Sequence, residues 1–241
     1  MKNDLFSIGP FTVHGYGLMI AIGVLSAYYM VEYRAKKKQM DWEKVFPLTV
    51  WSVLGGFLGS KILYLLTRLP DILANPALLG SSIKDGFVVY GGIIGGILTA
   101  WIYCKCTKWN FWKIFDIAMP AVAMAQGFGR IGCLLAGCCY GRELDPANPI
   151  GIVFHNSAYA PNDVALLPTQ IISSVLDFAN CFVLLALSKK LKTDGQVASC
   201  YLIFYSIGRF VLEYFRGDLI RGNVGEFSTS QFISLFICLI G

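Results

Sequence analysis

Seven long apolar segments dominate the sequence and decide its class of fold. They lie near residues 11–33, 45–66, 86–104, 115–137, 168–188, 196–215 and 227–241. Most approach the ~20 residues that an α-helix needs to cross a ~30 Å hydrocarbon core. The chain is 56% hydrophobic and 15% charged, with a mean hydropathy of +0.60. That balance excludes an ordinary water-soluble domain. We therefore predict an all-α integral membrane protein, a helical bundle of seven spans.

No soluble domain, low-complexity tract or long linker separates these segments. We predict a single transmembrane helical domain over residues 1–241. The first segment lacks a basic leading region and runs into a basic loop, so we expect it to stay in the mature protein. The last segment has about 15 residues, or about 22 Å of helix. We expect it to be short, supported by its neighbours, or cut off at the end of this sequence.

Basic residues in the loops predict the orientation of the bundle. They follow the first, third and fifth segments as Arg34, Lys36, Lys37, Lys38, Lys44, Lys105, Lys108, Lys113, Lys189, Lys190 and Lys192. Because loops rich in Lys and Arg stay in the cytoplasm, we predict an outside N-terminus and a cytoplasmic C-terminus. The alternate loops 67–85, 138–167 and 216–226 balance the two signs of charge. The net charge of +5 is thus a topology signal, and we expect no nucleic-acid partner.

Two of the outer loops have features of their own. Residues 71–79, DILANPALL, are partly amphipathic, and we expect a short helix in the outer membrane interface. The segment 141–167 is rich in Pro, Asn and Asp, and its residues 150–154 suit a strand or an interfacial turn. A loop of this length is as often a plain connector as a functional element.

Glycines at four-residue spacing indicate close packing between the second and third segments. They are Gly55, Gly56, Gly59, Gly91, Gly92, Gly95 and Gly96. Small residues at this spacing let two membrane helices approach closely, and packing alone explains most of them. The exception is the pair Gly91 and Gly92, which follows Tyr90 at the outer end of the third segment and is a candidate for a site.

Ionisable residues inside apolar segments are the first candidates for function, because each costs ~2.5–3.5 kcal/mol at the centre of a membrane helix. Lys61 and Arg216 lie near segment ends, where a long side chain can reach the interface. Arg209 and Glu213 are one helical turn apart, so a structural ion pair is an alternative to a functional role.

Arg130 differs from these residues because no carboxylate lies three or four positions away on its helix. Its neighbours Gly127, Gly129 and Gly132 lack side chains, and we expect them to leave the guanidinium open to a cavity. A guanidinium binds phosphate oxygens bidentately and stays charged at any relevant pH. We therefore favour a lipid phosphate as the ligand. A second arginine on the same phosphate would stabilise charge as it departs.

Further polar residues gather in the outer half of the predicted bundle. They are His14, Tyr16, Tyr90, Gln170 and Gln231. Any one of them is more often hydrogen-bonded to a neighbouring helix, or part of an interfacial aromatic belt. As a set they favour a site around one cavity.

The chain has eight cysteines. Most fall in or beside apolar segments, where a free cysteine packs as a small hydrophobic residue, so we expect no disulfide framework. Cys133, Cys138 and Cys139 leave four alternatives open: a metal site, a reactive thiol, a disulfide of the outer-facing Cys138 and Cys139 with another chain, or small-residue packing. Their Cys-x4-Cys-Cys spacing fits no common zinc or iron–sulfur motif, so we favour packing and expect no metal.

The run GFGRIGCLLAGCCYG at 127–141 resembles the signature of the prolipoprotein diacylglyceryl transferase family, a Gly-Arg-hydrophobic-Gly sequence in the fourth span. Similar short motifs follow the family's order along nearly the whole chain. They are VHGYGLM (13–19), GGFLGSKILY (55–64), VYGGIIGG (89–96), FDIAMP (115–120), LPTQ (167–170), GRFVLEYFRGD (208–218) and STSQ (228–231). Each is weak alone, and their joint order makes the resemblance specific.

The resemblance implies an enzyme that transfers the diacylglyceryl group of phosphatidylglycerol to the lipobox cysteine of a prolipoprotein signal peptide, and releases glycerol phosphate. It implies a multi-pass protein of the bacterial cytoplasmic membrane, without a cofactor, whose active site faces the outer leaflet. The expected catalytic residues are Arg130, Arg209 and Tyr90. The expected substrate-binding residues are Arg130, His14, Tyr16, Gly91, Gly92, Glu213, Arg216, Gln170 and Gln231.

The chain departs from the family pattern at several positions. Tyr90 stands where the family has the histidine of His-Gly-Gly, the usual candidate for activating the thiol. A phenol of pKa ~10 is a poor base unless a nearby cation lowers that value. Cys133 and Ala136 replace asparagines, Lys61 replaces an arginine, and Leu167 replaces a histidine. The lipid-phosphate residues are kept, whereas the means of thiol activation is left open.

Two other functions stay open from the sequence. A lipid-binding or lipid-moving paralogue would keep the phosphate site without transfer, and the tyrosine at position 90 favours it. A small-solute transporter is disfavoured, because no inverted repeat or proline-broken helix pair is visible. The presence of both Arg130 and Arg209 favours the transferase.

Overall fold

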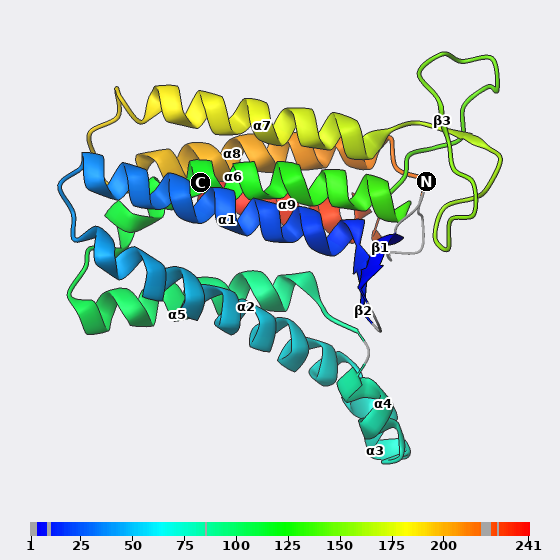
Figure 1. The fold of residues 1–241 in the computed structure, drawn as a ribbon, viewed down its shortest axis with the longest axis horizontal. Helices are drawn as coiled ribbons and strands as arrows, with labels where there is room; N and C mark the ends of the chain where they lie inside the picture. Colours follow the sequence, from blue (N-terminus) through cyan, green and yellow to red (C-terminus); the bar gives the residue numbers. More distant parts are fainter. Residues whose placement is uncertain (1–3, 9–10, 85, 218–222, 226) are drawn as a thin grey trace. The chain divides into compact units, whose positions relative to one another are not determined.

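The computed structural model describes residues 4–8, 11–84, 86–217, 223–225 and 227–241 (Figure 1). Contacts divide the chain into two compact units. The first unit comprises Met1–Val31 with Phe115–Gly241, and the second comprises Glu32–Ile114. The prediction of a single domain depends on how the two units combine, and it stays a prediction.

Five helical segments of the described chain are long and apolar enough to cross a membrane. They are Gly15–Lys37 (α1), Trp42–Thr67 (the 3-10 turn Trp42–Lys44 and α2, Val45–Thr67), Val89–Thr107 (α5), Phe111–Ala136 (α6) and Thr169–Leu187 (α7). The prediction of a helical integral membrane protein is therefore confirmed. The other two expected spans are helices of 18 residues, Gln196–Glu213 (α8), and 12 residues, Thr229–Ile240 (α9). The count of seven spans stays a prediction.

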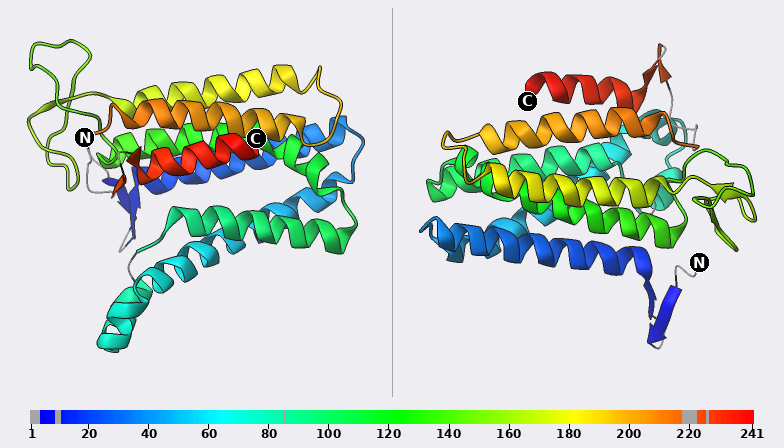
Figure 2. Two further views of the ribbon diagram at one scale, coloured as in Figure 1. Left: turned by 180° about the vertical axis from the view of Figure 1, so that it is seen from behind. Right: turned by 90° about the horizontal axis from the view of Figure 1, so that it is seen from above.

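The first unit is a bundle in which α1 and α6 to α9 run side by side (Figures 1 and 2). Its core is apolar and lies between α6, α7 and α8, where Met119, Ala123, Leu184 and Tyr201 pack together. Burying these side chains supplies the packing that orders the three helices, since membrane helices associate mainly through close contact and interhelical hydrogen bonds.

Hydrogen bonds between helices fix the register of this bundle. The carboxylate of Asp116 on α6 accepts the backbone N–H groups of Gly195 and Ala198, each at 2.8 Å, and so caps the N-terminus of α8. Ser174 Oγ on α7 donates to the backbone oxygen of Gly127 at 3.0 Å. The Ser174 bond holds α7 against the half of α6 that carries Arg130, and the Asp116 bonds hold the start of α8 against the other half.

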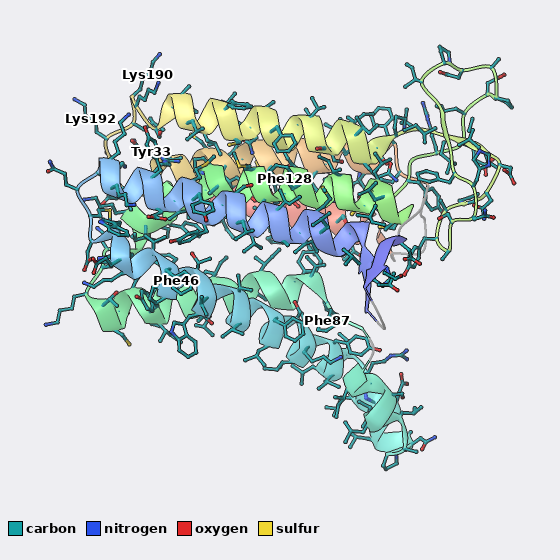
Figure 3. All side chains as sticks on the ribbon, viewed as in Figure 1. Tyr33, Phe46, Phe87, Phe128, Lys190 and Lys192 are labelled. Carbon is teal, nitrogen blue, oxygen red and sulfur yellow. The ribbon has the colours of Figure 1, made fainter. Side chains whose placement is uncertain are left out.

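Within the first unit, the helix ends nearest to its predicted site residues lie at one end. There α6 ends and α7 begins on either side of the loop 137–168, and α8 ends shortly before α9 begins (Figures 1 and 2). Arg130 is six residues, about 9 Å of helix rise, before the end of α6. Lys190 and Lys192 project from the opposite end, beyond the last turn of α7 (Figure 3).

The described residues of the first unit form three short antiparallel strand pairs. They are β1 (Asp4–Ile8) with β2 (Phe11–His14), β3 (Ile152–Val153) with β4 (Ala165–Leu166), and β5 (Asn223–Val224) with β6 (Phe227–Ser228). The strand alternative for 150–154 is thus confirmed. Helix α1 begins only at Gly15 because the β-branched pair Thr12 and Val13 belongs to a strand instead. Most of the expected outer loop 216–226 lies outside the described residues.

The second unit is built on the antiparallel pair α2 and α5. A Cβ at Gly59 would collide with the backbone oxygen of Gly91, and one at Gly95 with that of Gly55. The two backbones therefore touch, as the glycine spacing predicts. Two short helices, α3 (Leu69–Ala74) and α4 (Leu78–Lys84), occupy the predicted amphipathic loop. Their helical structure is confirmed, whereas their place at the interface stays a prediction.

Candidate active site

A cavity of about 320 Å³ in the first unit brings two of the predicted arginines together. Helix α6 contributes Arg130, α8 contributes Arg209, and α7 contributes Asp177. The other lining residues are mostly apolar: Ser173, Leu176, Ala179, Asn180, Val183, Phe204, Tyr205, Gly208 and Leu212. An apolar cavity with a few convergent polar groups is typical of a ligand site. The two guanidinium groups of this cavity can bind an anionic group, and its apolar lining can pack against a hydrocarbon chain attached to that group.

Arg209 is held in place from two sides. Its guanidinium donates to Ser230 Oγ at 3.0 Å and forms an ion pair with Glu213 Oε2 at 2.8 Å. The structural ion pair considered from the sequence is therefore present. It does not remove Arg209 from the site, because Arg209 still lines the cavity beside Arg130.

Asp177 was missed by the sequence reasoning. Its side chain is 9% exposed and interacts electrostatically with both Arg130 and Arg209. The signal that singled out Arg130, an ionisable residue within an apolar segment, applies equally to Asp177 in the segment 168–188. The cavity therefore holds one carboxylate that competes with an anionic ligand for the two guanidinium groups.

The glycines around Arg130 do not leave it open as predicted. A Cβ at Gly127 would lie 2.8 Å from the ring of Phe178 on α7, and one at Gly132 would lie 3.2 Å from the ring of Tyr16 on α1. Of the three, only Gly129 has nothing within 4 Å of that position. The prediction is wrong for Gly127 and Gly132, which serve close helix packing. The cavity reaches Arg130 from the side of α7 and α8.

The predicted Arg-x3-Glu-x2-Arg pattern forms one connected cluster at the end of α8. Glu213 accepts a hydrogen bond from Ser228 Oγ at 3.2 Å, and its Oε2 lies 4.0 Å from Nε of Arg216. The side chain of Arg216 is 6% exposed. Neither Glu213 nor Arg216 lines the cavity. Their observed contacts position Arg209, and direct binding of substrate stays a prediction for both.

The two predicted glutamines have partners within the protein. Gln231 forms a capping box with Ser228: its Oε1 accepts the Ser228 N–H at 3.0 Å, and Ser228 Oγ accepts the Gln231 N–H at 3.2 Å. It therefore starts α9. Gln170 donates to the backbone oxygen of Cys138 at 2.8 Å. Neither glutamine lines the cavity, and their role in substrate binding stays a prediction.

The structure places His14 and Tyr16 on different elements, with different partners. His14 is the last residue of β2, is exposed, and its Nδ1 lies 2.6 Å from Oδ1 of Asp4. Tyr16 is in the first turn of α1, packs against Gly132, and interacts electrostatically with Arg130. The structure thus keeps Tyr16 near the arginine of α6 and places His14 on the hairpin.

Tyr90, Gly91 and Gly92 belong to the second unit. Tyr90 is an exposed residue of the first turn of α5. A Cβ at Gly91 would collide with the backbone oxygen of Gly59, and one at Gly92 would lie 2.5 Å from Ser60 Oγ. Packing against α2 is therefore the observed role of both glycines. A catalytic role for Tyr90 and a binding role for the glycines stay predictions.

Lys61 has a structural role in the same unit. Its Nζ donates to the backbone oxygens of Ser82 and Gly86, each at 3.1 Å, and lies 4.6 Å from the ring centroid of Phe87. These contacts tie α2 to the chain that precedes α5. Whether the Lys61 side chain also reaches the membrane interface stays a prediction.

Three cysteines form a cluster at the end of α6. The Sγ atoms of Cys133, Cys138 and Cys139 lie within 4.8 Å of one another. No disulfide joins any of the eight cysteines, all of which lie among the described residues. Hydrogen bonds from Cys133 and Cys138, together with the guanidinium of Arg216, lower the pKa of Cys139. Hydrogen bonds within the cluster and burial raise the pKa of Cys138. Small-residue packing, the role expected from the sequence, stays a prediction for these three cysteines.

Comparisons with known proteins identify the family. The family model described as "Prolipoprotein diacylglyceryl transferase" matches residues 3–241. The chain is 46% identical to a phosphatidylglycerol–prolipoprotein diacylglyceryl transferase of Clostridium tetani, over 100% of this chain and 95% of the relative. It is 45% identical to the corresponding transferase 2 of Clostridium perfringens, over 100% and 93%. Identity to the Staphylococcus carnosus transferase is 31%, over 98% and 86%. The chain therefore belongs to the prolipoprotein diacylglyceryl transferase family.

Proposed function

We propose that the chain transfers the diacylglyceryl group of phosphatidylglycerol to the thiol of a lipobox cysteine in a prolipoprotein. Membership of the family supports this reaction, and the names of the Clostridium tetani and Clostridium perfringens relatives specify both substrates. Arg130 and Arg209 line one cavity together, and on this observation we assign the reaction to these two residues.

The charge balance around this cavity suits a phosphodiester. Arg130, Arg209 and Arg216 contribute three guanidinium groups, against the carboxylates of Asp177 and Glu213. With both carboxylates ionised, one positive charge remains to pair with the single negative charge of the lipid phosphate. Arginine suits this task because its planar fork binds two phosphate oxygens at once.

The same charges favour the chemical step. The acceptor sulfur, as thiolate, attacks the glyceryl carbon attached to the phosphate, and a C–S bond forms as the C–O bond breaks. The electron pair of the C–O bond stays on the phosphate oxygen, so the phosphate gains a negative charge as glycerol phosphate leaves. Arg130 and Arg209 would bind the leaving group more strongly than the substrate, which is the condition for lowering the barrier.

The apolar part of the cavity accounts for the lipid portion of the substrate. Leu176, Val183, Phe204 and Leu212 line it along α7 and α8. Acyl chains that run along these helices would place the phosphate at the end of the bundle, near Arg130. We assign Glu213 and Arg216 to the positioning of Arg209, on the strength of their contacts on α8.

We further propose seven spans with the N-terminus outside, in the bacterial cytoplasmic membrane. The basic loop that contains Lys190 and Lys192 supports this orientation, because it projects from the end of the first unit opposite to the end at which α7 begins (Figure 3). The arginine end of the unit would then face the outer leaflet. A secreted acceptor reaches the membrane on that side.

A second candidate function is lipid binding or movement without transfer. It is favoured by Tyr90, a phenol at the position that a histidine occupies in the family pattern. This alternative keeps the phosphate site and lacks the activated thiol.

One experiment separates the two functions. Purified protein receives phosphatidylglycerol labelled in its diacylglyceryl group and a lipobox peptide, and the label on the peptide is measured together with lipid binding. Transfer that falls at least ~100-fold in Arg130→Ala supports the enzyme. Arg68→Ala is the matched control, since Arg68 is an exposed arginine outside the first unit. Lipid binding without any labelled peptide would favour the second candidate.

A further inference from the structure

Three thiols converge where α6 ends. Cys133 lies in the last turn of α6, Cys138 and Cys139 follow it, and all three are half-buried with Sγ atoms within 4.8 Å of one another. Around a zinc ion with Zn–S bonds of ~2.3 Å, sulfur atoms in tetrahedral geometry are about 3.8 Å apart. The observed separations need to shorten by no more than about 1 Å to reach that geometry.

The backbone is constrained to hold the thiols together. Gly137 and Cys139 both adopt the left-handed conformation, with φ of 72° and 60°. This conformation is costly for a residue other than glycine, and it concentrates at functional sites. Thr169 Oγ1 donates to the backbone oxygen of Cys139 at 2.9 Å. The first turn of α7 thus fixes a turn that packing of small side chains would not require.

Charged and polar groups surround the cluster. Arg130 interacts electrostatically with Cys133 and Cys139, and Arg216 interacts with Cys139. Gln170 is held to the backbone oxygen of Cys138, and its Oε1 has no hydrogen-bond partner among the described residues although the side chain is 1% exposed.

We propose that Cys133, Cys138 and Cys139 bind a zinc ion and leave its fourth coordination position open for the acceptor thiol. Thiolate ligands select zinc over hard cations such as Mg²⁺ and Ca²⁺. Zinc sites with three protein ligands and one exchangeable ligand are characteristic of catalytic rather than structural centres. Arg130, where the phosphate of the lipid is expected, interacts electrostatically with two of the three ligands, Cys133 and Cys139.

The role of zinc in activating the acceptor thiol rests on the proposed transferase function. A thiol that binds zinc loses its proton to solvent and stays on the metal as a thiolate. That thiolate attacks the glyceryl carbon, the C–O electron pair goes to the phosphate, and the thioether product leaves the zinc. Zinc would in this way activate the thiol. In the family pattern that task is assigned to a histidine at the position where this chain has Tyr90.

Metal binding is tested on the full-length protein without reference to activity. Reduced, metal-free protein in detergent is titrated with Co²⁺, a coloured substitute for zinc. We expect thiolate-to-cobalt charge-transfer absorption that saturates at one ion per chain and disappears when Zn²⁺ is added. Cys133→Ser, Cys138→Ser and Cys139→Ser should each weaken binding at least ~10-fold. Cys106→Ser, which changes an exposed thiol on α5, is the matched control.

A second readout needs no variant and so does not depend on how each variant folds. In the unaltered chain, Zn²⁺ should protect these three cysteines from maleimide labelling and leave Cys106 reactive, as mapped by peptide mass. Absence of the charge-transfer band, or labelling that Zn²⁺ does not change, would overturn the site. A disulfide within the cluster in protein isolated without reductant would overturn it as well.

Transfer assays then separate this inference from the proposed function. Removal of the metal should lower diacylglyceryl transfer at least ~10-fold, and Zn²⁺ should restore it. Equal transfer by metal-free and zinc-loaded protein would overturn thiol activation and leave the transferase intact. Zinc-loaded protein that transfers nothing to any lipobox peptide would refute the transferase function, and the activation step with it, while the metal site would stand on the cobalt titration.

Discussion

Arg209 and Glu213 form an ion pair of 2.8 Å across one turn of α8, and the same arginine lines the cavity that Arg130 enters from α6. Glu213 does not line that cavity. In the positioning role proposed for it, the carboxylate acts on the site through Arg209, by holding the guanidinium against rotation into other contacts. An arginine fixed in this way loses little conformational freedom when phosphate binds.

Glu213→Gln should reduce transfer because Arg209 loses its charged partner. We expect kcat/KM for phosphatidylglycerol to fall about 10- to 100-fold, with a rise in KM larger than the loss in kcat, since the guanidinium is misplaced but not removed. Steady-state kinetics with the labelled lipid measure this split. Ser228→Ala, which removes only the hydrogen bond to Glu213, should have a smaller effect. An unchanged KM in Glu213→Gln would contradict the positioning role.

Asp177→Asn should tighten binding of the lipid phosphate. Asp177 faces both Arg130 and Arg209 within the cavity, so loss of its charge removes a competitor for the two cations. We expect Kd for phosphatidylglycerol to fall roughly 3- to 10-fold at low salt, with a smaller change at high salt. The matched opposite change is Asn180→Asp, which adds a carboxylate to the same wall and should weaken binding. Weaker binding in Asp177→Asn would show that this carboxylate orients the arginines.

Gly95→Ala should destabilise the second unit, because its new Cβ would collide with the backbone oxygen of Gly55 on α2. We expect a loss of about 1–3 kcal/mol in unfolding free energy, seen as a lower Tm in detergent. Gly91→Ala should lower Tm as well, because its new Cβ would collide with the backbone oxygen of Gly59. Gly96→Ala is the control, since its Cβ would lie 3.5 Å from Ser52 O, an ordinary contact. A Gly91→Ala variant with normal Tm and a raised KM would contradict a packing role and support substrate binding by Gly91.

Much of the fold was predictable because the membrane makes secondary structure simple. Each of the seven apolar segments contains a helix, since a chain in hydrocarbon must satisfy its backbone hydrogen bonds within the segment. The strand pair β1–β2 was not predicted, although it changes the start of α1 from residue 11 to Gly15. A four-residue strand beside a long apolar run leaves almost no trace in hydropathy.

Residues of the candidate site could be predicted only where an ionisable side chain lies within an apolar segment, because burying its charge there is costly. That cost singled out Arg130 and Arg209, which line one cavity, and it should have singled out Asp177 on the same cavity wall. The cysteine cluster could not be read from spacing, because it depends on the left-handed conformations of Gly137 and Cys139, which turn the chain back toward Cys133. The contacts of Gly127 and Gly132 depend on which neighbouring helix supplies an aromatic ring, and the sequence of one helix does not specify that.

The claim that two arginines act on one phosphate is tested most directly by a double-mutant cycle on the transfer rate. Arg130→Ala, Arg209→Ala and the double variant are compared with the unaltered chain for kcat/KM with labelled phosphatidylglycerol. If both guanidinium groups stabilise the same leaving phosphate, the double variant should be little slower than the worse single variant. Losses that simply multiply would contradict the account, because they would mean that Arg130 and Arg209 act independently on different groups.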